Sequence, residues 1–137
     1  FGVKEASGDL THCMEIMRHT SDDFMLIAGD DLLAIPMISI GAKGAIAVLP
    51  NVLPERFSTM IRAALQNDFE VARRLLLGFT DLNPLLYAEG NPVGAKAVLS
   101  LMGECEPFVR LPLAEASIHL LEELKAVLDK MAVAEKR

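Results

Sequence analysis

The chain has 137 residues, 52% of them hydrophobic, and a formal net charge of −6 at pH 7. This acidic balance argues against a nucleic-acid-binding protein, which needs a basic face, and no stretch reaches the roughly 18 apolar residues of a membrane helix. Cys13 and Cys105 are too far apart in sequence to indicate a zinc site or a disulfide scaffold. Free thiols are typical of a reducing compartment, so we expect a globular, cytoplasmic protein.

The first 50 residues alternate between apolar runs of strand length and helical patterns. Strands are expected at residues 2–4, 24–28 and 44–49, and helices at residues 10–18 and 32–40. Asp9 stands at the N-cap position of the first helix, and Pro36 would disturb the first turns of the second. This order predicts a parallel sheet with right-handed crossovers.

After Pro54 the pattern becomes entirely helical. Helices are expected at residues 55–66, 69–86, 92–102 and 115–132. Asn91 would cap the third of these, Pro92 would occupy its first position, and Gly103 would end it. We therefore divide the chain into a strand-containing part, residues 1–66, and a helical region, residues 67–137.

Lys4 is the residue that indicates chemistry. It follows a short apolar stretch and precedes a turn of small residues, Ala6-Ser7-Gly8. At the end of a buried strand a lysine loses hydration, which disfavours its charged form, and a neutral amine can form a Schiff base with a ketone. On local sequence alone, an ordinary surface lysine at a strand end is the simpler interpretation.

Four segments of the sequence favour the Schiff-base lysine over an ordinary surface lysine. Gly2-Val3-Lys4-Glu5-Ala6-Ser7-Gly8-Asp9 resembles the Schiff-base lysine motif of the pyruvate-dependent class I aldolases, the family of dihydrodipicolinate synthase and N-acetylneuraminate lyase. Three later segments resemble that family in the same order: Gly29-Asp30-Asp31, residues 41–48 with Asn51, and Glu89-Gly90-Asn91-Pro92-Val93 with Lys96. The resemblance implies an α/β chain that contains strands 6–8 of a (β/α)8 TIM barrel, followed by a C-terminal helical region. Because such a barrel needs about 250 residues, we expect this chain to be the C-terminal half of a larger enzyme.

The resemblance also implies a site at the carboxyl ends of the strands. Lys4 would be the nucleophile, and Gly29 and Ile46 would line the pyruvate site, Ile46 through its main chain. Asp30 and Asp31 are expected to border the pocket of the second substrate, although Asp31 could equally cap the next helix. Glu5 would point away from Lys4 and is expected to be structural.

The implied function is a lyase of lysine and diaminopimelate biosynthesis that condenses pyruvate with aspartate semialdehyde, without a metal or organic cofactor. By resemblance, the tyrosines of the proton relay and the carboxylate-binding groups would precede Lys4, and the assembly would be a homotetramer, a dimer of dimers. One alternative is another pyruvate lyase, acting on N-acetylneuraminate or a 2-keto-3-deoxy sugar acid. A second alternative, from another class, is a non-catalytic relative or an interaction fragment.

Several residues carry secondary expectations. The three histidines, His12, His19 and His119, share no metal spacing, and Tyr87 is expected to pack.

Four apolar residues are expected to face the barrel and to make an isolated chain aggregate: Leu26, Ile27, Ile46 and Val48. The broad apolar surface of residues 69–86, with Leu76 and Phe79, predicts a subunit contact.

Overall fold

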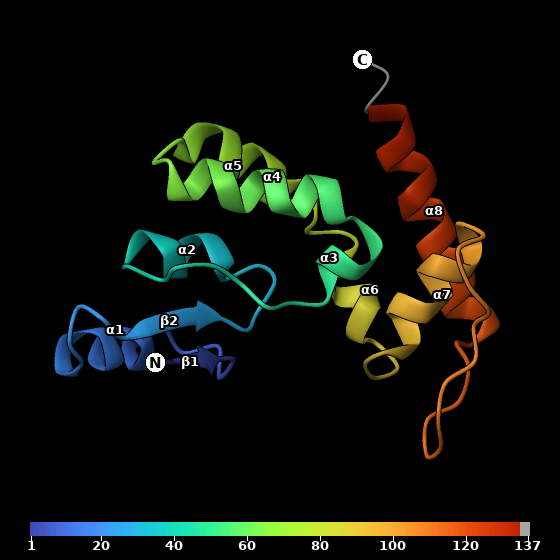
Figure 1. The fold of residues 1–137 in the computed structure, drawn as a ribbon. Coiled ribbons are helices and arrows are strands. Elements are labelled where there is room, and N and C mark those ends of the chain that lie inside the picture. Colours follow the sequence, from blue (N-terminus) through green and yellow to red (C-terminus); the bar gives the residue numbers. More distant parts are fainter. Residues whose placement is uncertain (135–137) are drawn as a thin grey trace. The chain divides into compact units, whose positions relative to one another are not determined.

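The computed structural model of the protein describes residues 1–134 (Figure 1). Contacts divide the chain into two compact units, residues 1–77 and the chain from Gly78 onward. The first unit contains the strands, and the described part of the second consists of helices and loops. The chain thus has the expected α/β character, while the domain division at residue 66 stays a prediction.

Two short parallel strands begin the first unit. β1 spans Gly2–Glu5, β2 spans Met25–Ala28, and Lys4 is paired with Ile27 in their register. Helix α1, Leu10–His19, connects them, and the Asp9 carboxylate accepts hydrogen bonds from Thr11 N and His12 N at 2.8 and 3.2 Å. The strand–helix–strand order and the N-cap at Asp9 are therefore confirmed.

The prediction of a third strand over residues 44–49 is wrong, because only its beginning pairs with β2. Its beginning does run along β2: Lys43 N donates to Leu26 O at 2.8 Å, and Ile46 N donates to Ala28 O at 2.8 Å. Ala45 forms an isolated parallel bridge with Ala28. The chain then turns into helix α3, Leu49–Val52, because the side chain of Asp31 holds the backbone where α3 begins.

Helices cover one face of the two strands. α1 and α2, Ala34–Ser39, contact β2 and each other. Leu26 and Ala28 of β2 are completely buried, so this is the face that carries the core of the sheet. The expectation that Leu26 faces the barrel, on the opposite side of the sheet, is therefore wrong. A parallel strand is apolar on both faces, and its sequence alone does not say which face a residue takes.

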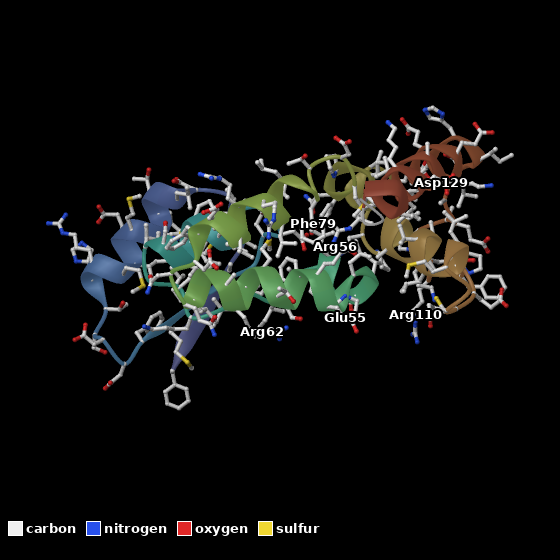
Figure 2. The ribbon with its side chains drawn as sticks, turned by 90° about the horizontal axis from the view of Figure 1, so that it is seen from above. Glu55, Arg56, Arg62, Phe79, Arg110 and Asp129 are labelled. Carbon is white, nitrogen blue, oxygen red and sulfur yellow. The ribbon has the colours of Figure 1, made fainter. Side chains whose placement is uncertain are left out.

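Helices α4, Pro54–Leu65, and α5, Phe69–Leu77, complete the first unit and pack against each other. The buried side of α4 consists of Phe57, Met60, Ala63 and Ala64. Glu55 and Arg62 lie on its exposed side, where Figure 2 shows them pointing away from the helix. This spacing is that of an amphipathic helix.

The single helix expected over residues 69–86 is wrong. α5 ends at Leu77, and helix α6, Asn83–Tyr87, begins after a turn that starts at Gly78. Pro84 lies at the start of α6, a position that favours proline because the first helical amides have no partner inside the helix. Phe79 consequently lies outside α5, and its side chain is completely buried.

Helices α7, Val93–Leu101, and α8, Ile118–Ala134, form the rest of the second unit with α6. α7 approaches α6 closely at Gly94, where a Cβ atom would lie 2.5 Å from the Cα of Leu86. Pro92, not Asn91, is the N-cap of α7, and no side chain caps this helix. Gly103, with a φ of +79°, follows the end of α7 as expected.

Glu89 ties the segment before α8 back to the end of α6. Its carboxylate accepts hydrogen bonds from Ser117 N at 2.9 Å and from the Ser117 hydroxyl, and these bonds lower the pKa of Glu89. The Ser117 hydroxyl in turn accepts a bond from Leu120 N at 3.2 Å, so it caps α8. The helix expected from residue 115 therefore begins at Ile118. Within residues 1–134, no helix is long and apolar enough to cross a membrane.

Candidate active site at the ends of the parallel strands

Lys4 lies one residue before the end of β1, and its side chain is exposed in the part of the chain that the structure describes. β1 pairs with β2 alone among the described strands, and Gly2, Val3 and Lys4 are all exposed. The desolvated environment expected for this amine is therefore not formed by residues 1–134. Any such environment would require further protein on this face.

Gly29 brings the end of β2 against the end of β1. Its amide donates to the carbonyl oxygen of Glu5 at 2.7 Å. A Cβ atom at residue 29 would lie 2.6 Å from the Cβ of Ala6 and 2.9 Å from the Cε of Lys4. The stem of Lys4 thus lies directly over Gly29, and only glycine leaves room for it.

Lys4 shares its face of the sheet with two isoleucines. Residues opposite each other in parallel strands point to the same face, so Lys4 and its partner Ile27 lie together, opposite buried Ala28. Because Ala45 bridges to Ala28, alternation places Ile46 on the face of Lys4. Ile46 is 58% exposed, so this apolar surface beside the amine is open in the described chain.

Asp30 and Asp31 both have structural hydrogen bonds. Asp30 accepts from Leu32 N and Leu33 N, each at 2.9 Å, and so it holds the turn that precedes α2. Asp31, only 1% exposed, accepts from Val48 N at 2.9 Å and Leu49 N at 2.7 Å. Asp31 thereby fixes the start of α3. The alternative in which it caps the next helix along the chain is wrong, because the N-cap of α2 is Leu33. A substrate contact by either carboxylate stays a prediction.

Glu5 is buried behind the strand, as expected for a structural residue. Its carboxylate accepts from Ser7 N at 2.7 Å and from the thiol of Cys13 in α1 at 3.2 Å. Hydrogen bonding by Ser7 holds the pKa of Glu5 below its ordinary value, and burial raises the pKa of the Cys13 thiol to about 11. Our sequence reasoning missed this partnership, although Cys13 belongs to the apolar stripe of α1.

The remaining candidates do not add to this site. His19 lies 3.1 Å from Glu15, and His119 lies 3.6 Å from Glu123, each pair on the surface of one helix. Among residues 1–134, no group of three or more His, Cys, Asp or Glu side chains could hold a metal ion. Tyr87 is 41% exposed at the end of α6, so the packing expected for it is partial.

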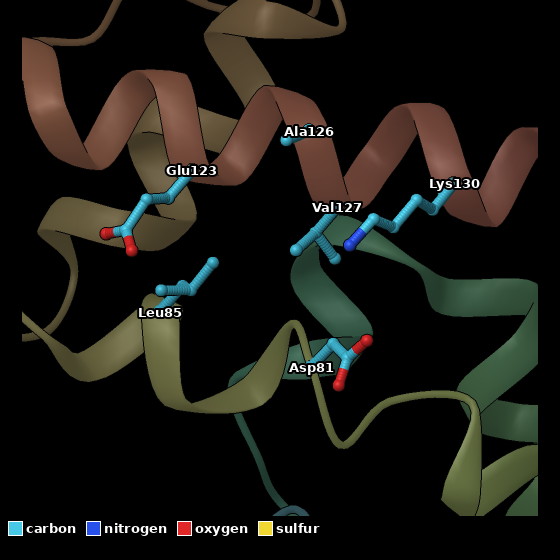
Figure 3. Close-up of a pocket in the computed structure, with 6 residues that line it drawn as sticks. All are labelled: Asp81, Leu85, Glu123, Ala126, Val127 and Lys130. Atoms are coloured by element: carbon cyan, nitrogen blue, oxygen red, sulfur yellow. The ribbon is translucent and has the colours of Figure 1, made fainter.

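Two hollows lie away from Lys4. One, of about 410 Å³, lies between the α6 region and α8, where Figure 3 shows Asp81 and Leu85 facing Glu123, Val127 and Lys130. The other, of about 380 Å³, lies between α2 and α5. Both mix apolar and charged side chains, and neither includes a residue of the strand ends.

The fold and the site together define a parallel α/β protein with a lysine amine at the carboxyl end of a strand. The chain belongs to the Dihydrodipicolinate synthetase family, whose model matches residues 1–131. It is 54% identical over 125 residues to the 4-hydroxy-tetrahydrodipicolinate synthase of Cytophaga hutchinsonii, covering 91% of this chain and 42% of that protein. The Phocaeicola vulgatus protein of the same name is 41% identical, with 96% of this chain and 44% of that protein covered.

Solved structures agree with the family assignment. Dihydrodipicolinate synthase from Aquifex aeolicus superimposes with a TM-score of 0.91 at 37% identity, covering 96% of this chain and 45% of that chain. The Thermotoga maritima enzyme also gives a TM-score of 0.91, at 31% identity and the same coverage. The chain therefore spans less than half the length of the relatives that it matches.

Proposed function

We propose that the chain is the C-terminal half of a (β/α)8-barrel lyase that condenses pyruvate with aspartate semialdehyde in lysine biosynthesis. The observation that best supports this proposal is the position of Lys4, whose stem lies against Gly29 at the carboxyl ends of two parallel strands. Active sites of such barrels lie at these ends. The names of the relatives favour aspartate semialdehyde as the aldehyde over the substrates of other pyruvate lyases.

In this mechanism the Lys4 amine attacks the ketone carbon of pyruvate. Loss of water gives a protonated imine, which withdraws electrons so that the methyl group loses a proton and an enamine forms. The enamine carbon then adds to the aldehyde of aspartate semialdehyde. Attack by the amino group of the second substrate closes the ring and releases Lys4.

The remaining half of the enzyme would cover the face that carries Lys4, Ile27 and Ile46. Ile46 is exposed here, and covering it with apolar residues would remove water from around the amine. Asp30 and Asp31 lie close after Gly29 in the chain, which keeps them as candidates for the border of the second pocket. We place the enzyme in the cytoplasm, in agreement with its free Cys13 and Cys105.

Covalent trapping tests this function. Pyruvate and a hydride reductant should add one pyruvate-derived mass to the full-length protein, and peptide mapping should locate it on Lys4. Aspartate semialdehyde should then be consumed together with pyruvate, whereas N-acetylneuraminate should be neither cleaved to pyruvate nor formed from it. Adducts spread over several lysines, or no adduct at all, would contradict the assignment and favour a non-catalytic relative.

We also propose a homotetramer in which α5 contributes to a contact between subunits. Phe79, expected in this contact, is completely buried, but Leu77 at the end of α5 is 60% exposed. Phe69 at its start is 36% exposed and lines the hollow between α2 and α5 together with Leu76. Leu77→Glu should shift sedimentation velocity toward smaller species, since a charge in an apolar contact is costly. Leu65→Glu, at another exposed leucine, is the control. A tetramer that survives Leu77→Glu would locate the contact elsewhere.

A further inference from the structure

We propose that Glu5 is a positioning residue for the Lys4 amine, and that Cys13 is its partner in this role. The inference rests on the proposed function, because it concerns the group that would attack pyruvate. It assigns a task to two buried polar groups that the proposed chemistry does not use directly. Both lie on the helix-covered side of the strand, away from the amine.

Three hydrogen bonds converge on Glu5. One carboxylate oxygen accepts from Ser7 N at 2.7 Å, and the other accepts from the Cys13 thiol at 3.2 Å. Its backbone carbonyl accepts from Gly29 N at 2.7 Å. Glu5 thereby joins the end of β1 to the following turn, to α1 and to the end of β2.

These bonds fix the peptide that carries Lys4, since Lys4 and Glu5 are consecutive. The stem of Lys4 passes so close to Gly29 that a Cβ atom there would lie 2.9 Å from Lys4 Cε. If the end of β1 shifted relative to β2, the amine would move with it. Misplacing a reacting group by about 1 Å can cost about a hundredfold in rate.

The protonation states of Cys13 and Glu5 keep their hydrogen bond in place permanently, and we call the hydrogen bonds of the Glu5 carboxylate to Ser7 N and to the Cys13 thiol the lock. Cys13 is 1% exposed, and burial raises the pKa of its thiol to about 11, so the thiol remains a donor at neutral pH. Hydrogen bonding by Ser7 lowers the pKa of Glu5, so the carboxylate remains an acceptor. The pair therefore keeps one hydrogen-bonding arrangement across the pH range in which the enzyme would work.

Glu5 acts through the backbone and not on the substrate. Its side chain is 8% exposed, and its register partner, Ala28, faces the helical layer. A proton-transferring group must come within hydrogen-bonding distance of the reacting atoms, whereas Glu5 points to the opposite face from Lys4. Loss of the lock should thus slow imine formation more than it weakens the binding of pyruvate.

The test uses the full-length protein and two substitutions, each of which removes a hydrogen bond of the Glu5 carboxylate. Cys13→Ala removes the thiol donor, and Glu5→Gln places an amide donor against either Ser7 N or the thiol. Rapid mixing with pyruvate, followed by quenching with borohydride, measures the rate of imine formation. In both variants the rate of imine formation should fall at least about tenfold below that of the parent, with a smaller change in KM for pyruvate. Cys13→Ser retains a donor and should recover most of the rate.

Ala64→Gly is the matched control, at a buried position of α4. It should lower the melting temperature without slowing imine formation. Parental rates in Cys13→Ala and Glu5→Gln would overturn the positioning role, as would an equal loss in Ala64→Gly. If the parent protein itself gives no adduct, the proposed function fails as well, a result distinct from a trapped parent with unaffected variants.

Discussion

Arginine in place of Lys4 should abolish covalent trapping by pyruvate and lower turnover by more than about a thousandfold, the scale of losing a covalent nucleophile. A guanidinium stays protonated and cannot form the imine. Because arginine, like lysine, has a long unbranched stem and a positive charge, the substitution should leave the fold intact. Intact-mass measurement after reduction, steady-state turnover and circular dichroism check these three expectations.

Lys43→Arg is the appropriate control for this loss. Lys43 is also exposed, and it lies on the segment next to β2, where its amide donates to Leu26 O at 2.8 Å. This variant should trap pyruvate and turn over at the parental level. A pyruvate adduct that persists in Lys4→Arg would show that another lysine is the nucleophile.

Alanine in place of Gly29 should damage both stability and chemistry. Its Cβ would meet the Ala6 Cβ at 2.6 Å, the Glu5 carbonyl oxygen at 2.7 Å and Lys4 Cε at 2.9 Å. Two of these contacts are with backbone or a Cβ atom, which cannot move without displacing a strand. We expect a loss of about 1–3 kcal/mol in the free energy of unfolding and a fall of about ten- to a hundredfold in imine formation.

Gly44→Ala offers a close comparison for this prediction. Gly44 also lies beside β2, accepting a hydrogen bond from Ala28 N at 2.9 Å, but a Cβ atom there meets nothing within 4 Å. Chemical denaturation and imine trapping should give values near those of the parent. Equal losses in Gly29→Ala and Gly44→Ala would mean that the close approach of Gly29 to Lys4 has no special role.

Local chemistry explains the parts of the fold that sequence could predict. Asp9 was identifiable as an N-cap because its acceptor acts within three residues, on Thr11 N and His12 N. The apolar run that forms β2 and its stop at Gly29 were similarly readable. The split of the helix expected over 69–86 was not, because the apolar stripe that begins at Phe69 and Ala72 continues past Gly78 to Phe79, which is buried although it lies outside α5.

Contacts between distant residues explain the rest. Asp31 bonds to Val48 N and Leu49 N, and no local pattern indicates a partner so far along the chain. The Glu5–Cys13 hydrogen bond joins a strand to a helix and depends on how α1 packs. For the site, the motif drew attention to Lys4 and Gly29, but their contact at Cε required the register of β1 and β2.

The parallel pairing of β1 with β2 also bears on how the chain acquires its structure. Lys4 and Ile27 meet by closing a loop that contains only α1 and its turns. The entropic cost of loop closure grows with the logarithm of loop length, and contacts that are near in sequence form faster than remote ones. The next pairing, of Ala28 with Ala45, closes a still shorter loop. The surroundings of Lys4 can therefore assemble one strand and helix at a time, in the order in which the ribosome delivers them.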